Sequence, residues 1–444
     1  MLKRISLHLQ DLHLFARFST KWLIISGSIG VLAGLSSAIF LVSLDWATQT
    51  RIANPNLLFG LPLAGLGVGW IYQRFGGIAA QGNNLVIEEV HSNQVRIPRR
   101  MALLILFGTV ATHLFGGSAG REGTALQMGA SLADSLCQLL QQHLPIMLQP
   151  TAHERRLMLM AGISGGFGAV FGTPVAGVVF GMEVQTIGRI RYEGLLPCLI
   201  AAYIGDLVVR VLGVAHTHYP QLAHAEIAPL LLVKVAGAGV LCGLVSHLFI
   251  ELNHVIKHMM TRIHNPALRP VVGGVLIIAL TLALGGGGIS ANDYLGLGVP
   301  LAVRSTQGQD VFILAFLLKL IYTALTLGTG FLGGEVTPLF VIGATLGSTL
   351  GWVLNVDPAF MAMLGFVAVF AGASNAPIAC TLMGIELFGG GAIVYVLLTC
   401  VMAYLVSGHR SIYITQRIGV TKSPGIDAHE NERLRDFSVR RKSM

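Results

Sequence analysis

Hydrophobic residues gather in long runs along this chain, and the runs have the length of membrane-spanning helices. A helix needs about 20 apolar residues to cross the hydrocarbon core of a bilayer. Runs of this kind begin at ten places, near Trp22, Leu57, Met101, Leu157, Leu195, Ala228, Val271, Val311, Met361 and Ile393. The pattern predicts an all-α, multi-pass membrane protein.

Four shorter segments between these runs are too polar and too rich in glycine to be ordinary spans: 76–90, 116–136, 328–350 and 371–390. Broken segments at membrane depth are tolerated only where their backbone lines a cavity or is buried in protein. In transporters they are the sequence feature that points to the binding site. We therefore expect the functional site within these segments.

Two pairs of motifs recur in the same order along the chain. Residues 120–124 (GREGT) can be laid over 334–338 (GEVTP), and the proline–glutamate segment 174–183 can be laid over 377–386. Repetition of two broken-helix motifs indicates a duplicated transporter fold.

The duplication divides the chain into parts. We expect a cytoplasmic N-terminal segment over 1–21, a first transmembrane repeat over 22–225 and a second over 226–416. A basic cytoplasmic tail over 417–444 is then too short for a further soluble domain.

Composition narrows the class of protein. Of the 444 residues, 53% are hydrophobic and only 11% are charged, against about 25% charged residues in soluble domains. A soluble enzyme is excluded because its surface would need charge that is absent. The five cysteines lie in apolar stretches without metal-like spacing, so we expect packing residues rather than disulfides, and neither a metal nor a cofactor.

The net charge of +8 is concentrated in loops and at the two ends, where the basic residues are Lys3, Arg4, Arg17, Lys21, Arg433, Arg435, Arg440, Arg441 and Lys442. The positive-inside rule then predicts that both termini are cytoplasmic, which requires an even number of crossings of the inner (plasma) membrane. Attraction to anionic lipid accounts for the basic tail better than nucleic acid does, and we expect no nucleic-acid partner.

Residues 118–124 and 334–338 both have the form of a glycine-rich turn that opens a helix. Backbone N–H groups at a helix start are unpaired and carry partial positive charge, so they bind anions. Two such starts aimed at one point would hold an anion without a full positive charge, and the anion could leave again. The sequence therefore predicts an anion site between these motifs.

Glu122 is a carboxylate beside this predicted site. It would compete with the anion for the N–H groups, and its protonation would free them. That competition is a physical route to coupling anion movement to a proton. The simpler alternative is a salt bridge between Glu122 and a basic residue.

These motifs resemble those of the CLC family of chloride channels and anion/proton exchangers. The resemblance rests on GREG at 120–123, on the 334–338 motif, on the repeated proline–glutamate segments and on Tyr413, and it extends over about residues 22–416. It implies two inverted-topology repeats with broken, tilted helices, and a homodimer with one pathway in each subunit. The short tail leaves no room for CBS domains.

The resemblance also assigns roles to individual residues. Glu122 matches the gating and proton-accepting glutamate, and Tyr413 matches the tyrosine whose hydroxyl faces the anion. The other expected anion-binding residues are Asn83, Asn84, Gly120, Arg121, Gly123, Val336 and Thr337. The register of the turn at 82–85 leaves open whether Asn83 or Asn84 faces the anion.

Four departures from the family pattern resemble its fluoride-exporting branch, which exchanges fluoride for a proton. They are Thr124 in place of proline, the Asn83–Asn84 pair, Glu335 within the second motif, and Val184 in place of the inner proton-relay glutamate. Fluoride stripped of water needs strong hydrogen-bond donors, which asparagine, threonine and tyrosine supply. A fluoride/proton antiporter is thus implied, and a chloride-selective exchanger or channel is the alternative.

An ionised Glu335 next to fluoride would repel it. We therefore expect Glu335 to be neutral during part of the cycle or to point to a partner. Lys319, in the middle of an apolar run, is the nearest candidate, and both residues are possible accessories of the site.

Other ionisable residues are expected to be structural. Asp206 and Arg210 have the spacing of an i, i+4 pair. Glu183 and Glu386 are expected to be helix-end or packing partners, and His113 to be a satisfied structural histidine.

Two further alternatives lie outside transport. A membrane enzyme would need a catalytic constellation, but His153–Glu154 is followed by two arginines, so a zinc motif is not completed. A scaffold that only dimerises would leave the broken helices and Glu122 unexplained. We expect no enzymatic activity and no catalytic residue.

Overall fold

The computed structural model describes residues 2–222, 224–286, 290–423, 429 and 431–443, and the side chains of 2–14, 147 and 440–443 are not described. The basic side chains Lys3, Arg4, Arg440, Arg441 and Lys442, which support the predicted orientation, lie outside the described side chains. The described part is almost entirely helical, as predicted.

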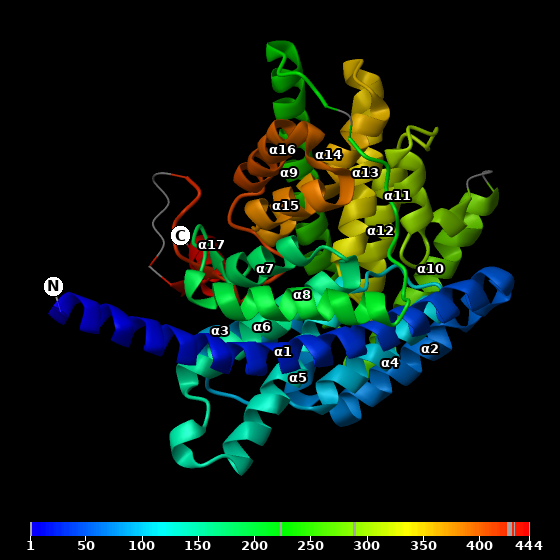
Figure 1. The fold of residues 1–444 in the computed structure, drawn as a ribbon. Helices are drawn as coiled ribbons and strands as arrows, with labels where there is room; N and C mark the ends of the chain where they lie inside the picture. The colour runs from blue at the N-terminus through cyan, green and yellow to red at the C-terminus, as the bar shows by residue number, and fades with distance from the viewer. Residues whose placement is uncertain (1, 223, 287–289, 424–428, 430, 444) are drawn as a thin grey trace.

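Eight α-helices precede the midpoint of the chain: α1 (Leu2–Ala53), α2 (Leu61–Ile71), α3 (Asn83–Ser92), α4 (Arg100–Leu114), α5 (Glu122–His143), α6 (Ala152–Phe171), α7 (Pro174–Glu183) and α8 (Leu195–Val211). Eight more follow in a corresponding order: α9 (Pro229–Met260), α10 (Arg269–Gly286), α11 (Val299–Thr306), α12 (Ala315–Gly328), α13 (Val336–Leu354), α14 (Pro358–Ser374), α15 (Pro377–Phe388) and α16 (Ile393–Val406). The first set fills the lower half of Figure 1 and most of the second set fills the upper half.

Single turns of helix connect these elements: η1 (Pro55–Gly60), η2 (Tyr72–Gly76), η3 (Gly77–Gln81), η4 (Ile146–Leu148), η5 (Tyr192–Gly194), η6 (Pro266–Leu268), η7 (Ala291–Tyr294) and η8 (Gly390–Ala392). Each of the ten predicted apolar runs falls on a helix. Residues 2–21, which were predicted as a separate N-terminal segment, form the first part of α1. Nothing between their basic residues and the first apolar run interrupts the helix.

Several helices are too short to cross a bilayer alone. Six helical stretches are long and apolar enough to do so: Phe15–Ala53, Pro55–Ser92, Tyr192–Val211, Pro229–Met260, Pro266–Gly286 and Val336–Leu354. Others, such as α7 with 10 residues and α15 with 12 residues, begin or end inside the protein. Their termini are buried among other helices, as broken segments require.

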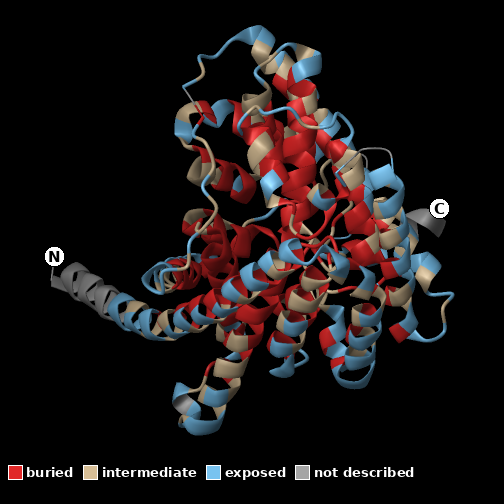
Figure 2. Ribbon diagram, turned by 90° about the vertical axis from the view of Figure 1, so that its right-hand side faces the viewer, coloured by how far each residue is buried: buried red, intermediate tan, exposed pale blue. Residues whose placement is uncertain are grey.

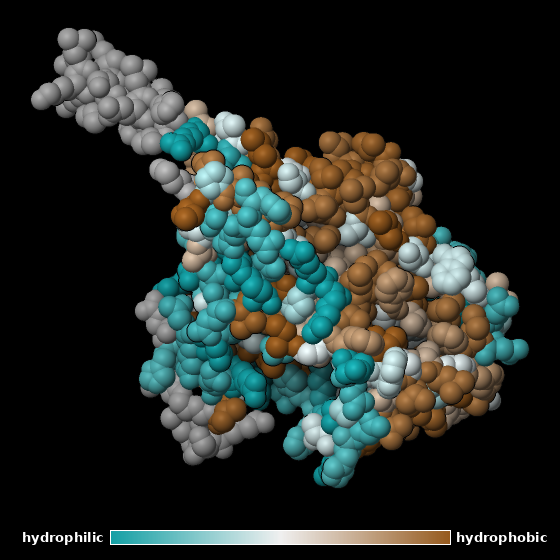
Figure 3. Space-filling model, turned by 90° about the horizontal axis from the view of Figure 1, so that it is seen from below, coloured by the Kyte–Doolittle hydropathy of each residue, from teal (hydrophilic) through white to brown (hydrophobic). Residues whose placement is uncertain are grey.

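The core lies between the two halves, where buried residues are concentrated (Figure 2). Aromatic rings fill its centre: Phe167 stacks on Phe180 with ring centroids 4.1 Å apart, and Phe340 stacks on Phe366 at 4.4 Å. On the outside, apolar residues cover a broad surface, while hydrophilic residues gather at the end from which the N-terminal helix emerges (Figure 3). This distribution suits a protein surrounded by lipid.

The two proline–glutamate segments form reciprocal helix caps. The carboxylate of Glu386, near the end of α15, accepts hydrogen bonds from the first N–H groups of α7, at 3.0 Å from Val175 N and 2.7 Å from Ala176 N. The carboxylate of Glu183, at the end of α7, accepts from the first N–H groups of α15, at 3.1 Å and 2.7 Å. The prediction that these glutamates are helix-end partners is confirmed.

A small three-stranded sheet joins the tail after α16 to the first half of the chain. Strand β2 (Arg417–Ile418) pairs in parallel with β1 (Thr186–Ile187) and antiparallel with β3 (Glu432–Arg433), and the short helix α17 (Leu434–Ser443) follows. Glu88 on α3 accepts hydrogen bonds from both Arg417 and Arg433, at 2.9 and 2.7 Å.

Two further structural predictions agree with the structure. Arg210 Nε lies 2.7 Å from Asp206 Oδ2, and all five cysteines are free and buried. Glu154 completes a capping box with Thr151 at the start of α6, so its role there is structural.

We predict that Glu183→Ala and Glu386→Ala each lower the free energy of unfolding by about 3 kcal/mol, because each leaves two helix-start N–H groups without their charged acceptor. Thermal unfolding of the detergent-solubilised protein measures the loss. Glu193→Ala, which removes an exposed pair with Arg191, is the control and should change stability by less than about 0.5 kcal/mol. Equal effects in all three variants would contradict the capping role.

Candidate functional site

The two repeated glycine motifs meet in the centre of the protein. Gly120 N donates to Gly334 O at 2.6 Å, and Gly334 N donates to Gly120 O at 2.8 Å. No larger residue fits here: a Cβ atom on Gly334 would lie 2.7 Å from Gly123 N. This backbone pair holds the starts of α5 and α13 against each other, as the sequence predicts for two helix starts aimed at one point.

The carboxylate of Glu122, the first residue of α5, sits on the start of α13. Oε2 accepts a hydrogen bond from Thr337 N at 2.9 Å, and Thr337 Oγ1 lies 2.5 and 2.6 Å from the two carboxylate oxygens. The side chain is fully buried. The carboxylate is therefore in the position of an anion bound to a helix start, where the predicted competition would take place.

Arg121 provides the only ion pair to Glu122 among the described residues. Its Nε lies 3.3 Å from Glu122 Oε1, and its backbone N donates to Oε2 at 3.2 Å. The alternative of a salt bridge is thus partly realised. It does not replace the contact with Thr337, because the carboxylate makes both at once.

The two asparagines have different surroundings. Asn83 is buried, and its Nδ2 lies 2.8 Å from the position of a Cβ atom on Gly123, at the start of α5. Asn84 instead faces Thr415, whose hydroxyl donates to its backbone oxygen at 2.9 Å. The structure therefore places Asn83, and not Asn84, beside the helix start.

Two residues expected to bind the anion each have a buried polar atom without a hydrogen-bond partner among the described residues: Asn83 Oδ1 and Tyr413 Oη. Buried polar groups are almost always paired. Tyr413 is 1% exposed, and its backbone N is held by Ser411 Oγ at 3.0 Å. A small polar ligand bound at this site would supply the missing hydrogen-bond partners.

The predicted pair of Glu335 with Lys319 is wrong. Lys319 Nζ donates to the backbone oxygens of Tyr294 and Gly296, at 3.1 and 2.8 Å, and these carbonyls are closer to it than any carboxylate. Glu335 directly precedes α13, and its Oε2 lies 3.8 Å from the position of a Cβ atom on Gly123. It remains near the site, where Lys257 is a nearby positive charge.

The residues around the motifs are structural supports. Val336 is buried as the first residue of α13. Thr124 Oγ1 lies 2.8 Å from Thr109 Oγ1, which ties α5 to α4. Both ring nitrogens of His113 lie within 2.9 Å of backbone oxygens, those of Thr109 and Ala119, so the ring is held in place by the backbone, as expected for a structural histidine.

One polar network was missed by the sequence analysis. Gln416 Nε2 donates to Val184 O at 2.6 Å, at the position that the resemblance assigns to the inner glutamate, and Gln416 Oε1 accepts from Asn375 Nδ2 at 3.1 Å. Lys422 Nζ in turn donates to Asn375 Oδ1 at 2.5 Å and to Tyr404 O at 2.7 Å. Burial lowers the pKa of the Lys422 ammonium to about 7. These residues are far apart in sequence, and no motif joins them.

No group of three or more histidine, cysteine, aspartate or glutamate side chains in the described ranges could hold a metal ion. The arrangement around Glu122 is instead suited to reversible anion binding. It offers backbone N–H, hydroxyl and amide groups, and a carboxylate that can take or leave the same donors.

The sequence is similar to those of known anion channels and transporters. A family model described as "Voltage gated chloride channel" matches residues 64–408. A "Chloride/fluoride channel protein" of Pseudomonas syringae pv. tomato is 45% identical over 411 residues, which cover 91% of this chain and 88% of that protein. An "H(+)/Cl(-) exchange transporter ClcA" of Vibrio cholerae is 27% identical over 399 residues, or 82% of this chain and 81% of that one.

Solved structures show the same fold. A crystal structure of a CLC-type fluoride/proton antiporter matches with a TM-score of 0.84 and 32% identity, over 90% of this chain and 98% of that chain. A slow cyanobacterial Cl⁻/H⁺ antiporter matches with a TM-score of 0.73 and 20% identity, over 87% of this chain and 94% of the other.

We predict that Thr337→Val lowers anion affinity at least about tenfold, because a hydrogen bond to a charged group is lost. Titration calorimetry with sodium fluoride and sodium chloride, in the Glu122→Gln background that removes the competing carboxylate, measures the change. Thr337→Ser keeps the hydroxyl and should bind as the background does. Unchanged affinity in the valine variant would remove this hydroxyl from the site.

Proposed function

The chain belongs to the CLC family of chloride channels and anion transporters, and on that premise we propose that it is a fluoride/proton antiporter that exports fluoride. The 45% identical relative carries chloride and fluoride in its name, and the 32% identical structure is of a fluoride/proton antiporter. Membership of a transporter family also excludes the membrane-enzyme alternative.

One observation carries the proposal: the Glu122 carboxylate lies on the donors of Thr337. An anion and this carboxylate cannot occupy the same N–H and hydroxyl groups at once. Protonation removes the negative charge of Glu122 and weakens its hold on those donors. The anion then takes its place, so each exchange of positions is linked to a proton.

The direction of transport follows from the proton gradient. Glu122 takes a proton from the outside, releases the donors to a fluoride ion from the cytoplasm, and returns to them when the proton leaves inward. Inward proton flow thereby drives fluoride out. The inner glutamate of the wider family is replaced by Val184, so this chain transfers the proton without that group.

The side chains near Glu122 favour fluoride. Fluoride is small and holds its hydration shell tightly, so a site that strips its water must supply strong donors. Asn83, Thr337 and Tyr413 provide an amide and two hydroxyls, and we assign them to the anion. Gly120, Arg121, Gly123 and Val336 shape the two helix starts. Asn84 is assigned a supporting role because it bonds to Thr415. Glu335 is assigned an accessory role because it lies near the site.

The alternative is a chloride-selective exchanger or a chloride channel. The word "Chloride" in the name of the 45% identical relative supports keeping it. A proton gradient imposed across the membrane drives anion movement through an exchanger but not through a channel. Anion flux under such a gradient therefore distinguishes the two.

We further propose that both termini are cytoplasmic in the inner (plasma) membrane and that repeats at 22–225 and 226–416 have opposite orientations. The boundary between the repeats falls between α8 and α9. The hydrophilic surface at the N-terminal end supports this orientation (Figure 3).

A homodimer is also part of the proposal. One face of α8 exposes a row of large hydrophobic residues at every fourth position: Leu195, Leu199, Tyr203, Leu207 and Val211. Such a row forms one stripe along a helix, and a second copy of the chain would cover it.

We predict that liposomes loaded with fluoride and chloride lose fluoride with matched proton uptake and lose little chloride, as recorded with two ion-selective electrodes and a pH electrode. Glu122→Gln should abolish proton uptake, since the amide cannot cycle a proton. Glu193→Gln, an exposed site far from the motifs, is the control. Chloride efflux as fast as fluoride efflux would establish the alternative instead.

We predict that light scattering of the detergent-solubilised protein gives a protein mass of two 47.1 kDa chains. Replacing Leu199 and Tyr203 by tryptophan should shift the mass toward one chain, because bulky side chains prevent close packing of the stripe. The same double change at Val233 and Leu241, exposed on α9, should leave it unchanged. A wild-type mass of one chain would refute the dimer.

A further inference from the structure

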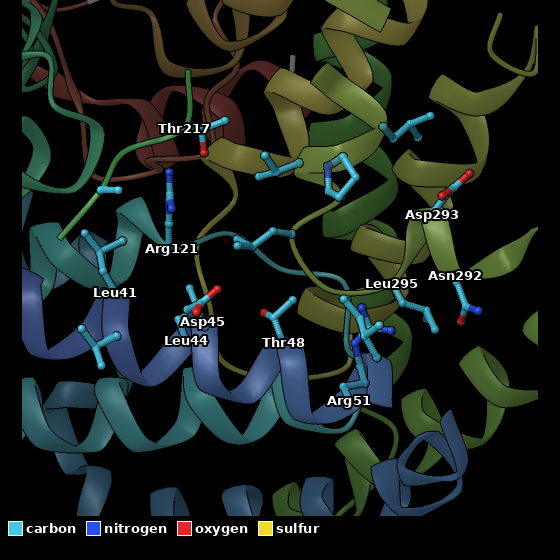
Figure 4. A pocket seen from close by; sticks show the side chains of 18 of the residues that line it. Leu41, Leu44, Asp45, Thr48, Arg51, Arg121, Thr217, Asn292, Asp293 and Leu295 are labelled. Atoms are coloured by element: carbon cyan, nitrogen blue, oxygen red, sulfur yellow. The ribbon is translucent and has the colours of Figure 1, made fainter. Parts of the chain in front are cut away.

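A cavity of about 750 Å³ lies beside the C-terminal part of α1 (Figure 4). It is bounded by residues 41–55 of α1 and η1, by the segment 292–301 and by the loop at 212–217. In the proposed orientation this cavity faces the outside.

Arg51 projects into this cavity from the last turn of α1, toward Leu295 (Figure 4). The residue is 8% exposed. No hydrogen bond or ion pair joins its guanidinium to another residue in the described part of the chain. Its guanidinium opens onto the cavity, so its five N–H donors and its charge must be compensated by what enters the cavity.

The side chains of Lys319 and His113 lie beside the same segment of chain as Arg51. A Cβ atom on Gly296 would lie 3.7 Å from Arg51 Nη2 and 4.0 Å from His113 Cδ2, and one on Gly298 would lie 2.9 Å from Lys319 Nζ. Lys319 is fully buried and its ammonium is bound only by backbone oxygens among the described residues. The segment 296–298 thus lies beside the cationic side chains of Arg51 and Lys319.

The acidic groups at the cavity do not neutralise Arg51. Asp293 Oδ2 is bound to Arg304 Nη2 at 2.5 Å. Asp45 lies on α1 with an exposed side chain, and it forms no ion pair with Arg51 in the described structure. Positive charge at the base of the cavity is therefore uncompensated.

Uncompensated charge of this kind is costly to bury, and ionisable residues within membrane segments commonly mark ion pathways. An anion at Arg51 would remove the cost and would satisfy the free donors with charge-assisted hydrogen bonds. The cavity gives such an ion access from the outside without rearrangement of the helices.

The other end of the same cavity is lined by Arg121 (Figure 4). Its Nε binds Glu122 Oε1, so one arginine contacts both the central site and the cavity. An anion displaced from the donors of Thr337 toward the outside would pass Arg121 and enter this space.

We propose that the cavity is an outer anion-binding site in which Arg51 is the principal ligand, and that exported fluoride pauses there before release. The pause on the exit route rests on the proposed antiport, whereas binding of a small anion at Arg51 does not. Bound fluoride at this point slows further export when the outside concentration is high.

Binding is tested first, by the rise in the thermal unfolding midpoint with sodium fluoride at constant ionic strength. The Glu122→Gln/Thr337→Val background weakens the central site, so the remaining rise reports the outer site. We expect added Arg51→Gln to weaken this dependence on fluoride at least about tenfold, and Arg51→Lys to restore part of it. Arg304→Gln changes the charge equally but removes a cation that is already paired, and should leave the rise intact.

Arg51→Gln should also raise the unfolding midpoint in the absence of anions, because it removes an unpaired buried charge. A purely structural role would produce the opposite shift. If Arg51→Gln and Arg304→Gln respond to fluoride alike, the outer site is refuted.

Transport is tested second, in the wild-type background. Fluoride efflux from liposomes is measured against increasing external fluoride, and we expect Arg51→Gln to need about tenfold more external fluoride for the same inhibition, with the same number of protons per fluoride. Unchanged inhibition, with binding lost in the first test, would refute the pause on the exit route. Absence of fluoride transport in the wild type would refute the proposed function and leave the binding result standing.

Discussion

Two reciprocal hydrogen bonds between Gly120 and Gly334 are the constraint on which the centre of this protein depends. They join two stretches of chain that bring a helix start to the middle of the molecule from opposite halves. Because both partners are backbone groups, the separation of the two starts is fixed to within the length of a hydrogen bond. Every polar group around the anion position is arranged relative to that pair.

In the proposed mechanism, with the helix starts fixed, selectivity and coupling reduce to competition for a few donors. Thr337 offers an N–H and a hydroxyl, and Glu122 is attached next to them through the first turn of α5. The carboxylate needs no separate gate, since it has the same charge and the same hydrogen-bonding requirements as the ion that it displaces. Rigid surroundings matter here because a looser site would let both bind.

Much of this arrangement could be predicted from sequence, for particular reasons. The ten apolar runs predict the main helices because helix length in a bilayer is set by its thickness. The repeated motifs predict that two helix starts meet at one point and that Glu183 and Glu386 are helix-end partners, because a duplication brings equivalent segments together. The partner of Lys319 was wrong because its acceptors are backbone oxygens at 294 and 296, which any sequence would supply. Arg51 and Lys422 were missed because one lies at the end of a helix and the other in the tail. The burial of single side chains at such places leaves no periodic pattern in the sequence.

The reciprocal caps have a consequence for biosynthesis. The first N–H groups of α7 are satisfied by a glutamate that is 211 residues further along the chain. At a synthesis rate of about 5–20 residues per second, that acceptor emerges roughly 10–40 s later. During this interval α7 is in or near the membrane with unsatisfied donors. The nascent first half therefore has a reason to remain near the insertion machinery until the second half arrives, and a chain truncated between the halves would expose a defect that quality-control factors can recognise.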